Sequence, residues 1–204
     1  MKALTKKLSI TFAILISSSL MTANASLIGQ DVDLALIYVE ANSGTPVFIA
    51  ENDLQNPITV NVVENDVEAP GFIDGFMDVN IESETLGVLF PGGVVIQGDA
   101  LSLNDALGLG PLDFIGLLFA NLSWGLDNPG EITGITNLQT NIAGFSESNV
   151  LFDQSNVAFN ILDLVIEANS FVIVDLVVSH DIPEPHTVLI FALTLISLGF
   201  TRRK

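Results

Sequence analysis

The stretch from Ser26 to Asp181 contains no lysine and no arginine, although it holds every acidic residue of the chain except Glu184. All 6 basic residues stand near the two chain ends, against 24 Asp and Glu in total. A fold built from this stretch cannot use Lys or Arg salt bridges, so it must depend on hydrophobic packing and hydrogen bonds. Its length suits one domain with a sizeable core. Because the chain has no cysteine, disulfides and cysteine-based sites are also excluded.

Several segments alternate apolar and polar residues with a period of two, which is typical of half-buried β-strands. In residues 76–82, for example, Met77, Val79 and Ile81 are expected to face the core. Turns rich in Gly, Pro and Asn separate the segments. The expected strands are 32–38, 57–63, 76–82, 86–90, 94–97, 131–137, 156–162 and 170–178.

Residues 103–118 interrupt this rhythm. Leucines could line one side of a short helix there, but Gly108, Gly110 and Pro111 break it, so a helical turn and a loop that caps the sheet are expected. The whole pattern predicts about eight to eleven strands in one all-β domain, residues 26–181. The expected architecture is an antiparallel β-sandwich or a jelly roll.

Residues 1–25 have the features of a secretory signal peptide. Lys2, Lys6 and Lys7 precede an apolar run, and small residues end the segment at Ala23-Asn24-Ala25. This small-x-small pattern predicts cleavage by signal peptidase between Ala25 and Ser26. The alternative is a retained membrane anchor, but the apolar run is shorter than the roughly 20 residues that span a bilayer.

The C-terminal segment has three parts in order: Pro183-Glu184-Pro185, an apolar run at 187–201, and the basic residues Arg202, Arg203 and Lys204. A helix over 187–201 would be about 22 Å long at 1.5 Å per residue, short of the roughly 30 Å hydrocarbon core. Snorkelling of the basic side chains and local bilayer thinning can cover this deficit. The positive-inside rule then places the basic tail in the cytoplasm.

These three parts resemble the PEP-CTERM sorting signal of Gram-negative bacteria, which an integral-membrane exosortase recognises. The resemblance covers residues 182–204, with Ile182 where valine is usual. It implies that Pro183, Glu184 and Pro185 form the processing motif, and that the transmembrane helix and basic cluster are removed or exchanged during sorting. The alternative is a stalk followed by an ordinary tail anchor.

The charge pattern excludes several kinds of partner. Without Lys or Arg the domain cannot neutralise phosphates, so nucleic-acid binding is not expected. It also lacks the guanidinium groups that clamp phosphorylated or carboxylated ligands. Repulsion among the acids should cost stability at neutral pH, and salt or divalent cations should relieve it.

A cluster of acids on a probable loop, Glu64, Asp66 and Glu68, is a candidate calcium site because calcium prefers oxygen ligands. The loop lacks the spacing and the glycine of an EF-hand. The favoured interpretation is therefore a set of solvated turn residues that keep an acidic surface soluble, and no cofactor is predicted.

An enzyme is not expected. The only histidine of the domain is His180, near its end, so neither a Ser-His-Asp triad nor a histidine zinc site can be assembled. Pairs of carboxylates, as in glycosidases, are unavoidable in so acidic a chain and carry no information. For sugar binding, Trp124 and Tyr38 are the available stacking rings, although a single tryptophan is more often a core filler.

The sequence therefore predicts an exported, non-enzymatic surface or extracellular-matrix protein that an exosortase sorts. By the resemblance, its setting is an exopolysaccharide-rich biofilm, and its partners are signal peptidase, exosortase and, transiently, the inner membrane. The alternative is a calcium-dependent or carbohydrate-binding adhesion module.

Overall fold

The computed structural model describes residues 26–49, 57–93, 95–96, 99–100, 102–106, 108–125 and 130–179. Residues Ala25–His180 form one compact unit. The predicted signal peptide, residues 1–25, and the predicted sorting signal, residues 182–204, lie outside the described residues, and both stay predictions. Among the helices that the structure describes, none is long and apolar enough to cross a membrane.

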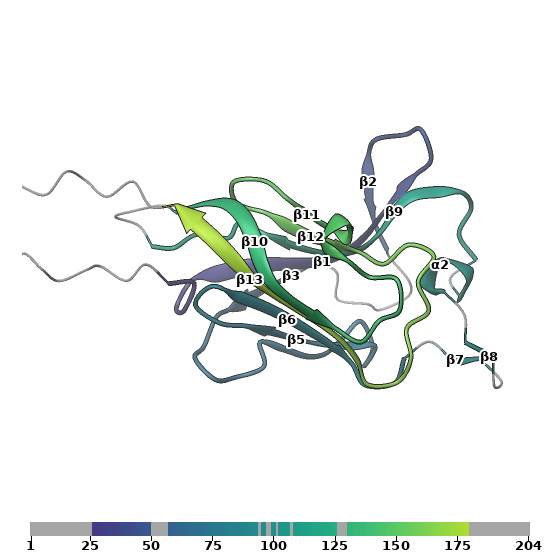
Figure 1. Cartoon of the computed structure of the whole chain (residues 1–204), viewed down its shortest axis with the longest axis horizontal. Helices are drawn as coiled ribbons and strands as arrows, with labels where there is room; N and C mark the ends of the chain where they lie inside the picture. The colour runs from purple at the N-terminus through teal and green to yellow at the C-terminus, as the bar shows by residue number, and fades with distance from the viewer. Residues whose placement is uncertain are drawn as a thin grey trace, which may run out of the picture. The chain divides into compact units, whose positions relative to one another are not determined.

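The described part of the chain is all-β, with two antiparallel sheets and a separate two-stranded hairpin (Figure 1). One short helix, α2(Leu103–Ala106), and one 3-10 turn, η1(Glu147–Asn149), accompany the strands. The strands are β1(Asp31–Glu40), β2(Pro46–Phe48), β3(Ile58–Asn61), β4(Ala69–Phe72), β5(Met77–Ile81), β6(Thr85–Phe90), β7(Val95–Ile96), β8(Asp99–Ala100), β9(Leu112–Ala120), β10(Glu131–Thr140), β11(Val150–Phe152), β12(Val157–Asn160) and β13(Ser170–Ser179).

The first sheet, called sheet A here, has the order β11-β12-β9-β1-β2. Strand β3 also pairs with β1, on the segment that starts at Asp31, whereas β2 pairs with the segment around Ile37. The second sheet, sheet B, has the order β10-β13-β6-β5-β4. Strands β7 and β8 pair only with each other among the described residues.

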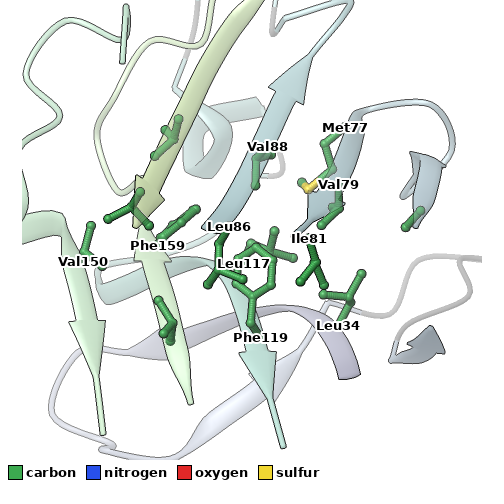
Figure 2. Packing of buried hydrophobic residues seen from close by; sticks show 14 of the residues in the cluster. Leu34, Met77, Val79, Ile81, Leu86, Val88, Leu117, Phe119, Val150 and Phe159 are labelled. Atoms are coloured by element: carbon green, nitrogen blue, oxygen red, sulfur yellow. The ribbon is translucent and has the colours of Figure 1, made fainter. Parts of the chain in front are cut away.

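One hydrophobic core lies between the two sheets and receives side chains from both (Figure 2). Leu34 and Leu117 come from sheet A, and Val79 and Leu86 come from sheet B. Burial of these apolar side chains provides the main driving force for folding, at about 25 cal/mol per Å² of apolar surface. The arrangement is sandwich-like, so the all-β, two-sheet part of the prediction is confirmed. The jelly-roll strand order stays a prediction.

The period-two segments are strands, as predicted. Met77, Val79 and Ile81 of β5 are each 0% exposed, whereas Asp78 and Asn80 point away from the core and are half-buried. Residues Val157 and Phe159 of β12 are buried in the same way. The described strands number thirteen, more than the eight to eleven expected. Five strands lie outside the ranges that the sequence predicted: the short strands β2, β4, β8 and β11, and the longer β9.

The prediction for residues 103–118 is wrong in its second half. The helical turn exists at Leu103–Ala106, but Leu112–Ala120 forms β9, which lies between β1 and β12 inside sheet A rather than capping it. From residue 114 to residue 120 this strand carries only apolar residues and a glycine, on both of its faces, so its sequence shows no alternation. The sequence Ala69-Pro70-Gly71 is typical of a turn. These residues instead belong to β4, an edge strand where proline is tolerated.

The first and last strands place the two ends of the domain at the same end of the molecule (Figure 1). Strand β1 begins beside the end of β9, and β13 ends at Ser179 beside Glu131, where β10 begins. Gln154 and Ser155, in the turn between β11 and β12, accept backbone hydrogen bonds from β10 and from the segment after β9. The hairpin of β7 and β8 lies at the opposite end (Figure 1).

Candidate functional site

The face of sheet A that points away from the main core is apolar. Along β1, Leu34 and Leu36 enter the main core, whereas the alternate residues Ala35 and Ile37 are buried on the other side. These two form a second apolar cluster with Phe114, and Val39, Leu118 and Ala158 pack against it. The outward face of an antiparallel sheet is commonly polar and solvated. The outer face of sheet A, as this surface is called below, departs from that rule and is therefore the candidate site.

The strand register arranges this face in rows, because residues paired across antiparallel strands point to the same side. One row crosses four strands: Ala35 pairs with Leu118, Leu118 with Ala158, and Ala158 with Leu151. Leu151, at the end of the row, is 51% exposed. The row is therefore apolar along its whole length, buried at Ala35 and exposed at its outer end, Leu151.

A second row brings an aromatic ring to the outer face. Phe48 of β2 pairs with Ile37 of β1, and Ile37 pairs with Gly116 of β9. Phe48 is 50% exposed, so much of its side chain is open to a partner. Gly116 is required at its place because a Cβ there would lie 1.7 Å from the carbonyl oxygen of Phe159.

Two depressions lie on this face, on either side of Leu118. The first has a volume of about 340 Å³ and is lined by Asp33, Ala35, Phe48, Pro57, Thr59, Leu118 and Ala120. The second has a volume of about 230 Å³ and extends from Leu118 past Ala158 to Leu151. Alanines lie between larger side chains in both, which makes the surface concave. The two depressions together are called the groove below.

Asp33 supplies the groove with a firmly oriented carboxylate. The hydroxyl of Thr59 donates to Asp33 Oδ1 at 2.6 Å, and the side-chain amide of Asn121 donates to Oδ2. Asn121 has a left-handed backbone (φ 61°), a conformation that asparagine tolerates better than most residues. A carboxylate offers about four acceptor positions, so Asp33 can accept further hydrogen bonds from a ligand.

A second acidic group borders the other depression. Asp153 Oδ1 accepts hydrogen bonds from the backbone N–H groups of Ser155 and Asn156, both at 2.9 Å. The backbone N–H of Ser155, followed by the side-chain amide of Asn156, lowers the pKa of Asp153 below its usual value. Both hydrogen bonds favour the charged form, so Asp153 is ionised at neutral pH.

The two rings predicted for sugar stacking lie elsewhere. Trp124 is 2% exposed in the main core, and its indole N–H donates to the carbonyl oxygen of Ser83 at 3.2 Å. The interpretation of this tryptophan as a core filler is therefore confirmed. Tyr38 is half-buried and packs against the same core. Two exposed rings border the depressions instead, Phe48 at 50% and Phe152 at 43% exposure. The sequence reasoning missed both, because each lies on a strand of only 3 residues that shows no alternation.

The candidate calcium loop has a structural contact instead. Both carboxylate oxygens of Glu68 accept backbone hydrogen bonds, from Val63 at 3.1 Å and from Ile81 at 2.6 Å. Glu64 and Asp66 are exposed. Within the part of the chain that the structure describes, no three His, Cys, Asp or Glu side chains form a group that could hold a metal ion. The loop thus gives the calcium alternative no support.

The remaining predicted site residues belong to the chain ends. Ala23 and Ala25, at the predicted signal cleavage site, lie outside the described residues, and Ser26 is the first residue described. Residues 183–185, the predicted processing motif, and the basic residues 202–204 also lie outside them.

Comparisons of this chain with protein-family models, with curated proteins and with solved structures find no match. Its functional interpretation therefore depends on its own residues: an acidic, sandwich-like β domain with an apolar groove on the outer face of sheet A.

Proposed function

We propose that this chain is an exported, non-enzymatic protein of the cell surface or extracellular matrix, sorted by an exosortase in a Gram-negative cell. The observation that carries the proposal is the C-terminal order of Pro183-Glu184-Pro185, an apolar run and three basic residues. An N-terminal segment with the features of a signal peptide precedes the domain. The confinement of all basic residues to the chain ends agrees with an exported domain between two membrane signals.

The geometry of the domain suits display from one end. Strand β1 begins and β13 ends at the same end of the domain, so the connections to both terminal segments start from that end (Figure 1). The groove lies on the outer face of sheet A. Its border supplies carboxylates, an amide and a hydroxyl, which are groups that can hydrogen-bond a polar ligand.

The experiment that tests this proposal follows the C-terminus in native cells. Replacing Pro183, Glu184 and Pro185 by alanine should leave the protein in the inner membrane with residues 202–204 still attached. The wild-type surface form should lack them, as mass spectrometry of the mature C-terminus would show. Ile182→Val, which introduces the residue usual at that position, is the matched control and should be sorted like the wild type. A full-length tail in the surface or released fraction would contradict the proposal.

A carbohydrate-binding adhesion module is the second candidate function. The observation that favours it is the groove, where an exposed aromatic ring, Phe48, and the oriented carboxylate of Asp33 line the same depression. Ligand sites are typically concave and mainly apolar, with a few well-placed polar groups. This candidate is compatible with sorting to the surface, since it concerns what the displayed domain binds there.

A further inference from the structure

We infer that the groove on the outer face of sheet A binds a glycan chain that carries no acidic groups. The inference deepens the proposed function, and it rests on that function for the setting in which the domain meets such a glycan. The binding itself is a property of the folded domain, so it can be tested apart from sorting.

The apolar part of the groove fits the faces of sugar rings. A pyranose ring presents C–H groups on its faces and hydroxyl groups around its rim. Phe48 offers an exposed ring for such a face, and Leu118 and Leu151 continue the apolar surface across the sheet. Burial of apolar surface is favourable, and an aromatic ring adds a contribution that depends on its orientation.

The polar part of the groove fits the rim of the same rings. Thr59 and Asn121 already hold the Asp33 side chain in place. Its carboxylate can therefore accept hydrogen bonds from sugar hydroxyls without a further loss of side-chain entropy on binding. A hydrogen bond from a hydroxyl to a carboxylate is stronger than one between neutral groups. At the other depression, Asp153 is oriented in the same way by Asn156.

The negative charge at the border of the groove limits which glycans can bind. The charged residues that border the groove, Asp33 and Asp153, are both acidic, and the domain has no lysine or arginine to neutralise a uronate or sulfate. An acidic polysaccharide would be repelled, because like charges in contact cost free energy. A neutral chain meets no such repulsion, and an amine-bearing chain would be attracted.

The same argument disfavours a second copy of this chain as the occupant. The chain has a formal net charge of −18, and its basic residues lie outside the domain. Two copies that met through their outer faces would bring the carboxylates of Asp33 together without any cation between them. A neutral hydroxyl-rich chain covers the apolar surface without this repulsion.

The dimensions suit a short stretch of an extended chain. From β3 to β11 the face crosses four strand spacings, which amounts to about 19 Å at about 4.8 Å each. The first depression, about 340 Å³, lies near the lower end of the roughly 300–1,000 Å³ common for small-ligand sites, and the second, about 230 Å³, lies below it. A shallow groove of this kind predicts weak, multivalent attachment to a polymer rather than tight capture of a single sugar.

The test uses residues 26–181, which contain the whole described hydrophobic core. The probes are immobilised cellulose, β-1,3-glucan, dextran, galactomannan and partly deacetylated chitosan, with alginate and heparin as acidic polysaccharides. The expected result is saturable binding to at least one of the first five and none to the acidic two. Binding to none of the seven, or binding to alginate or heparin, would overturn the inference.

Variants locate the binding surface. Phe48→Ala should raise the Kd about tenfold, and Phe48→Tyr, which keeps the ring, should bind like the wild type. Leu89→Ala removes a 39%-exposed side chain from sheet B and serves as the matched control. Equal losses in Phe48→Ala and Leu89→Ala would contradict the groove as the site. A dimer of the wild type in sedimentation, absent in Phe48→Ala, would assign the surface to a second copy instead.

The outcomes for sorting and for binding are separable. Phe48→Ala in native cells should be processed at its C-terminus like the wild type, while its retention in the matrix falls. If the domain fails to bind any glycan but the tail is still processed, the groove inference is wrong and the proposed sorting stands. If the domain binds through Phe48 but the tail is never processed, the proposed sorting is wrong and the groove inference stands.

Discussion

Glu68 Oε2 accepts a hydrogen bond from the backbone N–H of Ile81 at 2.6 Å. The other oxygen of the same carboxylate accepts from the backbone N–H of Val63 at 3.1 Å. Glu68 therefore connects the end of the β3 region to the end of β5, and so joins the border of sheet A to sheet B. Glu68, a candidate calcium ligand in the sequence analysis, thus has a structural role in the described part of the chain.

Glu68→Ala should lower the free energy of unfolding by about 2 kcal/mol, because two backbone N–H groups lose a charged acceptor. For a domain of this length the melting temperature should fall by about 4–8 °C. Glu68→Gln, which keeps one carbonyl acceptor, should cost less. Glu64→Ala removes an exposed carboxylate from the same loop and should change stability by no more than about 0.5 kcal/mol. Equal effects of Glu64→Ala and Glu68→Ala in thermal unfolding would contradict this role.

Gly116→Ala should prevent stable folding. The added Cβ would lie 1.7 Å from the Phe159 carbonyl oxygen, a backbone atom that cannot move without separating β9 from β12. We expect the free energy of unfolding to fall by more than about 4 kcal/mol, which would appear as a much lower urea midpoint of unfolding or as insoluble protein. The control is Gly134→Ala in β10, where the nearest atom is Val177 Cβ at 3.7 Å. That variant should fold normally, and a Gly116→Ala protein as stable as the control would refute the packing described for β9.

The stability that Asp153 contributes should depend on pH. Hydrogen bonds from the Ser155 backbone and the Asn156 side chain lower the pKa of Asp153 in the folded state. A lowered folded pKa gives stability that is present above the unfolded value of about 3.9 and is lost as pH falls through the folded value. The melting temperatures of wild type and Asp153→Ala should therefore differ at pH 6 and converge toward pH 2. A constant difference across this range would show that the carboxylate is not responsible.

Salt should stabilise the acidic domain. Raising NaCl from about 10 mM to about 1 M shortens the Debye length from about 30 Å to about 3 Å, so the repulsion among carboxylates is screened. The melting temperature of residues 26–181 should rise over this series. An unchanged or falling melting temperature would mean that the acids lie too far apart for their repulsion to matter.

Calcium and magnesium at matched concentration should shift the melting temperature by similar small amounts, because screening does not distinguish them. A specific site would instead stabilise by RT ln(1 + [L]/Kd), about 2.7 kcal/mol at a hundred times Kd. A saturable shift at sub-millimolar calcium that magnesium does not reproduce and that Asp66→Ala abolishes would restore the calcium alternative.

Most strands that the sequence predicted correctly have one buried face and one more open face, although β1, predicted at residues 32–38, is buried on both. In β5, Met77, Val79 and Ile81 alternate with polar residues, and this local pattern is enough to predict both the strand and its inward side. Strand β9 has no such pattern, because apolar contacts surround it in the middle of sheet A. An apolar run near glycines and a proline does not distinguish a buried strand from a loop or short helix.

The groove could not be predicted from the sequence, because its residues come together only through strand pairing. Phe48 becomes part of it only because β2 pairs with β1 at Ile37, and Leu151 only because β11 pairs with β12 at Ala158. A shift of one residue in either register would send these side chains to the other face. Trp124, the single tryptophan of the chain and one of the two rings considered for sugar stacking, is buried in the core.

Composition and local sequence pattern were enough to establish the charge of the domain and the side of each alternating strand that enters the core. They were also enough to predict that phosphate-rich partners are not bound and that the protein is exported. These are properties of composition or of neighbouring residues, so no partner strand is needed to recognise them. The folded sheet was needed to show that Ala35, Leu118, Ala158 and Leu151 form one row and that Asp33 and Phe48 line the same depression. The reason is that these residues come from strands far apart in the chain, and the hydrogen-bonded register of the folded sheet brings them together.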